Sequence, residues 1–312
     1  MSTHRVLVDK NTGKKHCIDD LIESKHKSED EKLRQTFGDH TKLNASQLLP
    51  KVDLRSGMPP IKHQGRVNSC VGSAMAEGYE YLLKKRSRSG IDVGRLSIYY
   101  NARVRGKFAD GKIIDKGSII PYIIEVLKQF STCLKSMWPY DIKKVNERPS
   151  DEAYEAAKNN WMTRLLRLKV DLNEMKTCLT QEYPLIFGVK TFGLRHKVKE
   201  NGIVPMPKPG ESQSKDHRRN ATLAIDYRHH LKTFIVQNSW RNDWGDKRYC
   251  YNPYDYMTDD DFCFQGLAVR QVETDDIDYE HWIYDDSIDY QPDNVDEEKP
   301  NEQEEQNNQD NQ

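Results

Sequence analysis

The segment QGRVNSC, Gln64–Cys70, runs directly into the stretch CVGSAMAEGYEYLLKK, Cys70–Lys85, and these two stretches decide the fold expected of this 312-residue chain. Apolar side chains recur in the second stretch at intervals of three and four residues, which predicts an amphipathic helix beginning at Cys70. A thiol in the first turn of a helix faces the positive end of the helix dipole, which favours the thiolate that attacks carbonyl carbons. Cys70 is therefore a candidate nucleophile, and the alternative is that it is a small apolar residue of the core.

Two further segments carry groups that would assist such a nucleophile. Gln64 precedes Cys70 by six residues, and its amide could donate to a developing oxyanion together with the backbone N–H of Cys70. Far downstream, the segment NSWRNDWGD begins at Asn238 and carries Trp240 and Trp244. An asparagine amide oxygen covered by indole rings could hold an imidazole in one orientation.

The order of apolar patterns predicts an α+β protein with two lobes. The first half is mostly helical, and the second half is mostly antiparallel strands, which are separated by turns rich in proline and glycine. Helices are expected over 70–85, 96–104, 119–130, 150–160 and 172–179, and strands over 184–192, 221–227, 233–239, 248–251 and 266–272, with an apolar-alternating segment over 165–170.

Composition divides the chain into three parts. The total charge of -1 conceals a net charge of +14 over residues 1–272 and of -15 over residues 273–312. We expect an extended N-terminal arm over 1–50, a folded domain over 51–272 and a disordered acidic tail over 273–312. One hypothesis is that this tail folds over the basic domain, and the alternative is that it serves only solubility.

Several classes of protein are excluded or disfavoured by the sequence. It contains neither an apolar run long enough to cross a membrane nor the apolar centre of a secretory signal, so we expect no membrane association and a cytoplasmic location, or a virion if the source is viral. Its six cysteines are dispersed, which favours buried, reduced thiols over a disulfide scaffold or a zinc site. The spacing of cysteine and histidine predicts no metal, and nothing indicates an organic cofactor.

Taken together, these segments resemble the papain-like cysteine peptidases. The pattern Q-G-x-x-x-S-C of that family matches Gln64–Cys70, and its N-S-W-G-x-x-W-G block matches Asn238–Gly245 except at Arg241. The stretches VDLRSGMPPIKHQG, LSIYYNARV, WPYD, NGIVPMPKPGE and NPYDY are similar to those of free-standing bacterial and large-virus members that lack a long inhibitory propeptide. The resemblance covers about residues 52–272. It implies the papain-like fold, with Cys70 as nucleophile, Gln64 at the oxyanion and Asn238 as the orienting amide.

The chain departs from the family pattern at the general base. The family has a histidine in G-H-A-V-L-A-V-G-Y, and Asn220 occupies that position here. An amide cannot take a proton from a thiol. The nearest substitute is His217, three residues earlier, which would serve if its loop folds back toward Cys70. His63, His229 and His230 are expected to be solvated or packing residues.

Two other departures concern the compartment and a turn. Val67 stands where secreted members carry a further cysteine, which favours a reducing environment. Arg248 replaces a glycine in the W-G-x-x-G-Y turn, a costly change if that position requires a positive φ, so either the turn has changed or the site is relaxed.

Three functions follow as hypotheses. The first is a thiol endopeptidase with a protein or peptide substrate, in which Cys70 attacks and a histidine such as His217 moves protons. The second is a catalytically impaired relative that binds extended peptides. The third is a binder of polyanions or nucleic acid through the basic domain, but scattered lysines and arginines are ordinary on a protein surface and no nucleic-acid motif is present.

Overall fold

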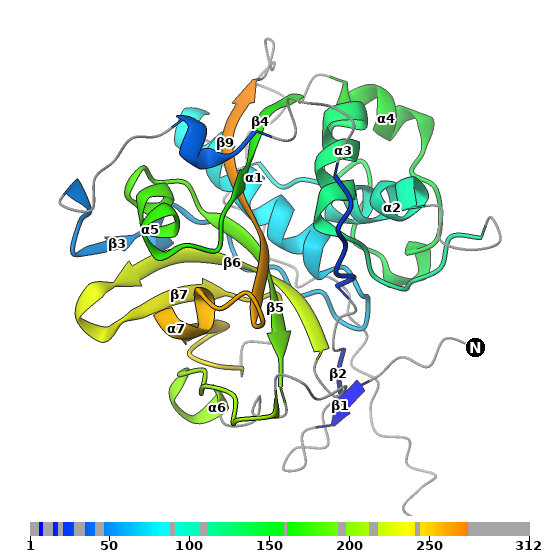
Figure 1. Cartoon of the computed structure of the whole chain (residues 1–312). Coiled ribbons are helices and arrows are strands. Elements are labelled where there is room, and N and C mark those ends of the chain that lie inside the picture. Colours follow the sequence, from blue (N-terminus) through cyan, green and yellow to red (C-terminus); the bar gives the residue numbers. More distant parts are fainter. Residues whose placement is uncertain are drawn as a thin grey trace, which may run out of the picture.

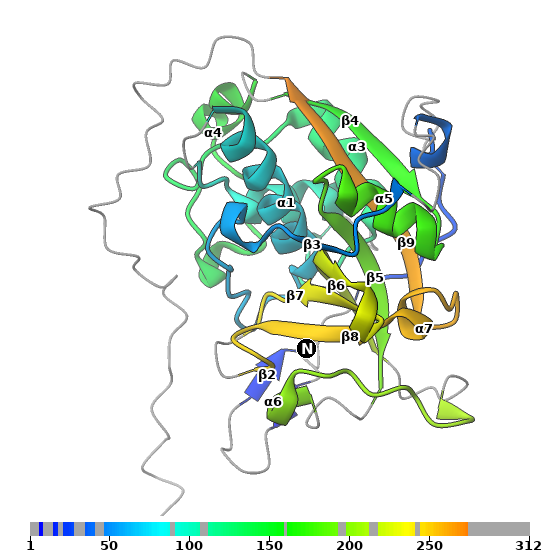
Figure 2. The ribbon, with the colours of Figure 1, turned by 90° about the vertical axis from the view of Figure 1, so that its left-hand side faces the viewer.

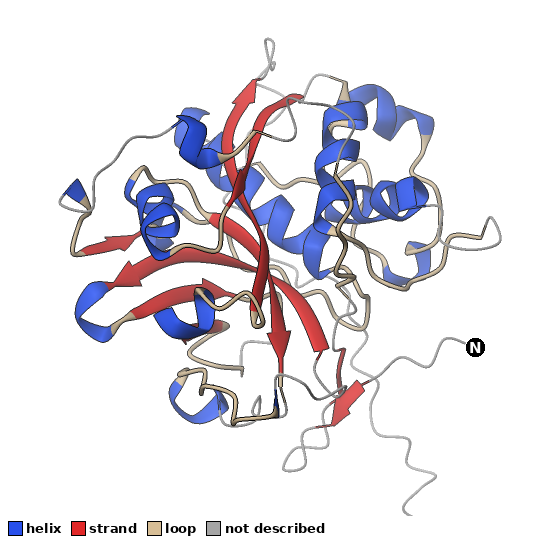
Figure 3. Ribbon diagram, in the orientation of Figure 1, coloured by secondary structure: helices blue, strands red, loops and turns tan. Residues whose placement is uncertain are grey.

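The computed structural model describes residues 6–8, 15–17, 21–27, 35–40, 47–87, 91–106, 112–158, 161–192, 198–211, 218–240 and 244–273. Within them, helices and strands are largely segregated into two lobes (Figure 1; Figure 3). This is the α+β arrangement expected from the sequence. None of the helices in the described part combines the length and the apolar character that a bilayer crossing demands.

The helical lobe is built around α1, which begins at Cys70 as predicted. Capping groups visible in the sequence begin two of the smaller helices: Ser150 accepts a hydrogen bond from the backbone N–H of Ala153, and Asp171 from that of Glu174. The helices of this lobe are α1 (Cys70–Ser87), α2 (Arg95–Gly106), α3 (Ile120–Phe130) and α4 (Asp151–Ala157). The helices α5 (Leu172–Thr180), α6 (Val198–Asn201) and α7 (Tyr254–Met257) lie beside the sheet (Figure 1). Short 3-10 turns follow or precede them at Phe37–His40, Arg55–Gly57, Ile142–Lys144 and His229–Leu231.

The second lobe is an antiparallel sheet of seven described strands in the order β4-β9-β5-β6-β7-β8, with β3 paired to β6. The adjacent ribbons of β6, β7 and β8 are seen in Figure 2. The strands are β3 (Lys51–Asp53), β4 (Trp161–Leu168), β5 (Leu185–Thr191), β6 (Arg218–Arg228), β7 (Thr233–Gln237), β8 (Tyr249–Pro253) and β9 (Cys263–Glu273); β1 (Val6–Val8) and β2 (Lys15–Cys17) form a separate pair.

The core joins the two lobes where α1 packs on the sheet. A methyl group placed on Gly78 would lie 3.6 to 3.7 Å from the side chains of Leu223, Ile186 and Val269, so the helix and the sheet are in van der Waals contact. Because β6 is covered on both faces, its residues are buried almost continuously, whereas β8 alternates between buried and half-buried residues. Five cysteines carry buried, reduced thiols, in agreement with the prediction from their spacing: Cys70, Cys133, Cys178, Cys250 and Cys263.

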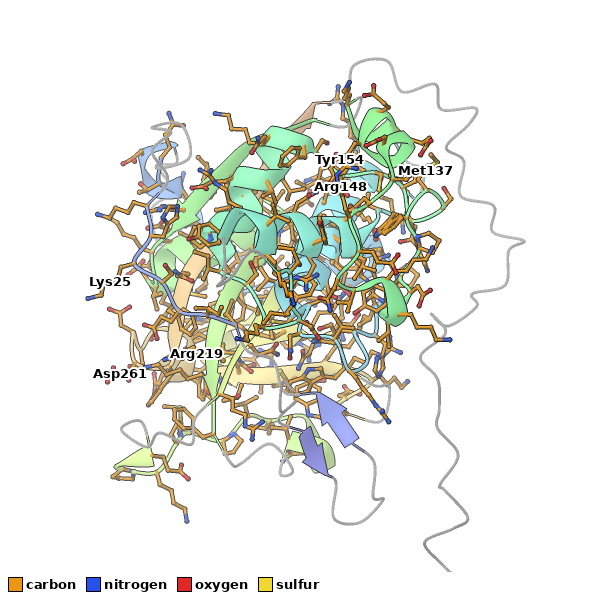
Figure 4. All side chains as sticks on the ribbon, turned by 90° about the vertical axis from the view of Figure 1, so that its right-hand side faces the viewer. Lys25, Met137, Arg148, Tyr154, Arg219 and Asp261 are labelled. Carbon is orange, nitrogen blue, oxygen red and sulfur yellow. The ribbon has the colours of Figure 1, made fainter. Side chains whose placement is uncertain are left out.

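A segment of the N-terminal region, 21–27, crosses from one lobe to the other. The backbone N–H of Leu21 donates to the carbonyl of Arg219 on β6, and that of Ile22 donates to Ser118, just before α3. Farther along, Glu23 pairs with the Arg219 guanidinium at 3.1 Å. The side chain of Leu21 is 2% exposed, so this segment is part of the packed structure (Figure 4 labels Arg219).

Candidate active site

Cys70 is held at the first turn of α1 by the packing of the residues before it. The Ser69 hydroxyl lies 2.7 Å from the hydroxyl of Tyr140, and the Ser69 carbonyl accepts the N–H of Ser73 as the helix begins. The Cys70 side chain is completely buried. The helix start therefore has the position that the sequence predicts for a nucleophile, and a substrate can reach the thiol only if covering groups move.

The Gln64 amide is oriented by contacts from both lobes. Its Nε2 donates to the carbonyl of Val67 at 2.8 Å, and its Oε1 accepts a hydrogen bond from the Ser239 hydroxyl. Its backbone N–H donates to the Ser239 carbonyl at 2.9 Å, and its carbonyl accepts from Tyr140 at 2.7 Å. These contacts fix the amide group, whose Nε2 carries a second N–H.

Three of the predicted site residues are thus joined through their neighbours. Tyr140 connects Gln64 to Ser69, the residue before Cys70, and Ser239 connects Gln64 to the residue after Asn238. Tyr140 lies in the segment WPYD and Ser239 in NSWRNDWGD, but sequence alone predicts a role for neither. Their hydrogen bonds join residues 71 and 175 positions apart, so no local pattern identifies them.

Asn220 and Asn238 form a direct pair in the second lobe. Nδ2 of Asn220 donates to Oδ1 of Asn238 at 3.1 Å, and both side chains are buried. Among the described residues, Oδ1 of Asn220 has no hydrogen-bond partner. Asn238, which the sequence predicts to orient an imidazole, therefore holds another amide, which has no basic nitrogen.

A cavity of about 50 Å³ lies beside this pair. Both asparagines line it, together with Thr222 on the same face of β6. Trp240 and Trp244 also line it, and their rings meet edge to face with centroids 4.6 Å apart. The two indoles and the two asparagines thus line one cavity, which leaves space next to the Asn220 side chain.

The other candidate bases differ in how the structure places them. His217 lies outside the described residues. His229 and His230 are exposed in the turn after β6, and because a strand rises about 3.3 Å per residue, His229 is roughly 30 Å from Asn220. Nδ1 of His63 accepts the backbone N–H of Gly65 at 2.6 Å, so that nitrogen is already engaged.

The segment before Gln64 is anchored by buried charges. The backbone N–H of Lys62 donates to Glu77 at 2.8 Å, while its ammonium lies 3.0 Å from Glu80 and also contacts Asp92. Burial raises the pKa of Glu80, and the Lys62 ammonium opposes that shift. Burial alone would lower the pKa of Lys62, but the charges of Glu80 and Asp92 raise it, so the ammonium stays protonated.

Arg248 takes a positive φ of 72° in the turn between Trp244 and β8. The turn has therefore kept the conformation that favours glycine although an arginine occupies it. The Arg248 side chain is buried and donates to the carbonyl of Ile61.

Comparison with known proteins places this geometry in a family. The family described as papain family cysteine protease matches residues 49–257. An uncharacterized peptidase C1-like protein of Acanthamoeba polyphaga mimivirus is 31% identical over 220 residues, covering 67% of this chain and 69% of the viral protein. Peptidase 1 of Euroglyphus maynei is 28% identical over 222 residues, covering 67% of this chain and 62% of the mite protein.

Solved structures show the same fold. Xylellain, a cysteine protease from Xylella fastidiosa, is similar with a TM-score of 0.67 and 25% identity, over 82% of this chain and 96% of xylellain. A digestive procathepsin L of the Tenebrio molitor larval midgut has a TM-score of 0.60 at 14% identity, over 77% of this chain and 75% of the procathepsin.

Proposed function

Because this chain belongs to the papain family of cysteine proteases, we propose that it hydrolyses peptide bonds with Cys70 as its nucleophile. The observation that carries the proposal is the fixed geometry before α1, where Gln64 is hydrogen-bonded to Val67 and Ser239 and Cys70 begins the helix. We propose that its substrate is a protein or a peptide.

The proposed reaction has two steps. The sulfur of Cys70 bonds to the scissile carbonyl carbon, and the oxygen of the tetrahedral intermediate accepts hydrogen bonds from Gln64 and from the Cys70 backbone N–H. The C–N bond then breaks, and the thiol proton passes through a base to the leaving amine. Water finally hydrolyses the thioester, releasing the carboxylic acid and restoring the thiol.

We assign the base to His217. Asn220 cannot carry a proton between thiol and amine, and His229 and His230 lie at the far end of β6. His217 precedes Asn220 by three residues, which span roughly 10 Å when extended. Its loop must therefore turn back toward Cys70 for the assignment to hold.

A specific observation favours a second candidate, a protein that binds peptides without cleaving them. The Asn220–Asn238 hydrogen bond uses the orienting amide to hold a group that has no basic nitrogen. In this alternative the oxyanion groups and the thiol remain, but proton transfer is missing.

Peptide hydrolysis by wild type and three variants separates the two candidates. If His217 is the base, His217→Ala should lower kcat by about 10²- to 10⁴-fold, the usual contribution of general acid–base catalysis. His230→Ala is the matched control because that histidine is exposed and remote, and it should leave kcat unchanged. Cys70→Ala should abolish peptide hydrolysis whether it is combined with His217→Ala or with His230→Ala.

Asn220→His tests the second candidate directly. The cavity beside Asn220 offers room for the larger imidazole, which Asn238 could then orient. If wild type binds peptides without cleaving them, this variant should gain hydrolysis. Efficient wild-type hydrolysis that survives His217→Ala would show that another group is the base.

Alkylation of Cys70 by iodoacetamide across pH gives an independent measurement. An activated thiolate should react well below pH 8, whereas an unperturbed thiol reacts appreciably only as the pH approaches about 8 to 9. The second pattern would contradict the peptidase proposal.

A further inference from the structure

Arg248 occupies a backbone conformation that favours glycine. Its φ is 72°, and that of the preceding residue, Lys247, is 52°. Both residues therefore carry the strain of a side chain in the left-handed region. They differ in surroundings, because Lys247 is exposed whereas Arg248 is buried.

The backbone of Arg248 supports the orienting amide. Its carbonyl accepts the N–H of Asn238 at 3.0 Å, and its own N–H donates to the carbonyl of Trp244 at 2.9 Å. The start of the Asn238 segment is thus tied to this turn.

The side chain of Arg248 reaches the other part of the site. Its Nη1 donates to the carbonyl of Ile61, three residues before Gln64. Nε is buried and, among the described residues, has no hydrogen-bond partner. A buried guanidinium with one donor unsatisfied is costly, and the positive φ adds to that cost. We therefore expect the Arg248 side chain to have a role that compensates for this cost.

The segment from Ile61 to Gln64 is held at every residue. The helical lobe holds its middle: Glu77 accepts the N–H of Lys62, and Arg95 donates to the His63 carbonyl at 2.8 Å. The sheet lobe holds its two ends through Arg248 at Ile61 and Ser239 at Gln64. Without the Arg248 side chain, the carbonyl of Ile61 would lose its hydrogen bond from the sheet lobe.

We propose that Arg248 is a positioning residue that couples Asn238 to the oxyanion amide of Gln64 through the Ile61 carbonyl. This rests on the proposed role of Gln64. A glycine would suit the turn better but has no side chain to reach Ile61, which accounts for an arginine at a strained position.

The experiment measures the affinity of a peptide aldehyde for full-length protein. The Cys70 sulfur bonds to the aldehyde carbon, the C=O π bond opens and the thiol proton ends on the oxygen, which then lies at the oxyanion donors. Arg248→Gly should weaken this affinity by about 10-fold, because a displaced oxyanion donor weakens binding of the tetrahedral adduct. Iodoacetamide labelling of Cys70, which forms no oxyanion, should change by less than about 2-fold.

A double-mutant cycle distinguishes positioning from a general structural role. In a Gln64→Ala background, Arg248→Gly should weaken the aldehyde by less than about 2-fold, because its effect passes through Gln64. Lys247→Gly relieves strain at the neighbouring residue without removing a buried contact, and it should leave the affinity unchanged. Arg248→Asn, whose side chain tolerates a positive φ, serves if the glycine variant does not fold.

Three outcomes would contradict the proposed role of Arg248, and a different outcome would contradict the peptidase function. An equal loss in both backgrounds, no loss in wild type, or a wild type that binds no aldehyde would overturn the role of Arg248. Failure of the peptidase function gives a different result, in which wild type binds the aldehyde but cleaves no peptide. If wild type does cleave peptides, Arg248→Gly should lower kcat about 10-fold with little change in KM.

Discussion

Strand β6 carries buried polar atoms that have no hydrogen-bond partner among the described residues, which is unusual in a folded protein, although Arg228 lies 4.0 Å from Asp226. Among the described residues these are Oδ1 of Asn220, Oγ1 of Thr222 and both carboxylate oxygens of Asp226. Each such group costs about 1–3 kcal/mol unless water reaches it. Asn220 and Thr222 line the cavity, where water could bind, whereas Asp226 lies at the other end of the strand, opposite Asp53 on β3.

Asp226 should make stability depend on pH. Burial, reinforced by the charge of Asp53, raises the pKa of Asp226 to about 7, although Arg228 and Arg55 oppose this. Because the folded protein then holds a proton that the unfolded chain releases near pH 4, stability should fall as the pH rises from about 4 to 7. The loss should be roughly 2–4 kcal/mol, since one pKa unit corresponds to about 1.4 kcal/mol.

Urea unfolding of wild type and Asp226→Asn at pH 5 and pH 8 tests this prediction. Relative to wild type, the variant should be more stable at pH 8 than at pH 5, since asparagine cannot ionise. The pH-independent effect of the new amide cancels in that comparison. An identical difference at both pH values would show that Asp226 does not titrate in this range.

At the scale of elements, two glycines in α1 mark where the helix meets its neighbours. A methyl group on Gly72 would lie 3.0 Å from the carbonyl oxygen of Arg95 and 3.1 Å from Cβ of Tyr99, both on α2. A methyl group on Gly78 would make ordinary contacts with the sheet. The close approach of α1 and α2 therefore depends on Gly72, while Gly78 is not required by its surroundings.

The two positions should respond oppositely to alanine. Gly78→Ala should raise the free energy of unfolding by about 0.5–1 kcal/mol, because alanine favours the helix over glycine. Gly72→Ala should lower it by about 1–3 kcal/mol, because backbone atoms of α2 must move. Chemical denaturation of the two variants measures both effects, and equal changes would contradict the packing described for α1.

Much of this element structure was predictable from sequence because the apolar periods are regular. The helix beginning at Cys70 and the strand around Ala221–Tyr227 were both expected, and β6 extends the latter at each end. The three-residue strands β1 and β2 are too short to give a periodic signal. The contact of Arg248 with Ile61 joins residues 187 positions apart, so no local pattern could indicate it.

The residues of the candidate site likewise include some whose placement sequence predicts and some whose placement it does not. Cys70 and Gln64 stand in a short contiguous motif, so their positions near one helix start were predictable. The Asn220–Asn238 hydrogen bond depends on how β6 and the end of β7 lie together, and sequence identified only the substitution, not the partner. Tyr140 contributes a hydroxyl to both Gln64 and Ser69, a role that appears only once the helical lobe is packed.

At the scale of the whole molecule, the segment 21–27 holds the two lobes against each other. Leu21 contacts the sheet near Gly188, where a methyl group would come within 2.8 Å of its Cδ2. His26 binds Glu125 of α3 at 2.8 Å, so the same short segment is anchored in the helical lobe. Figure 1 shows this dark-blue stretch passing beside α3.

Truncating Leu21 should therefore destabilise the protein as a core substitution would. We expect Leu21→Ala to lower the free energy of unfolding by about 2–4 kcal/mol, because the side chain is fully buried. Lys25→Ala, at an exposed position of the same segment, is the control and should change stability by less than about 0.5 kcal/mol (Figure 4). Equal effects of the two substitutions, measured by chemical denaturation, would show that Leu21 is not part of the core.

The pairing of Glu23 with Arg219 spans 196 residues of sequence. A ribosome adding about 5–20 residues per second needs roughly 10–40 s to make the chain between them. During that interval the apolar side chain of Leu21 has no sheet against which to pack. Segment 21–27 therefore cannot yet join the two lobes. Completion of the native state during biosynthesis must therefore wait for β6, so segment 21–27 leaves the ribosome well before the strand that fixes its final place.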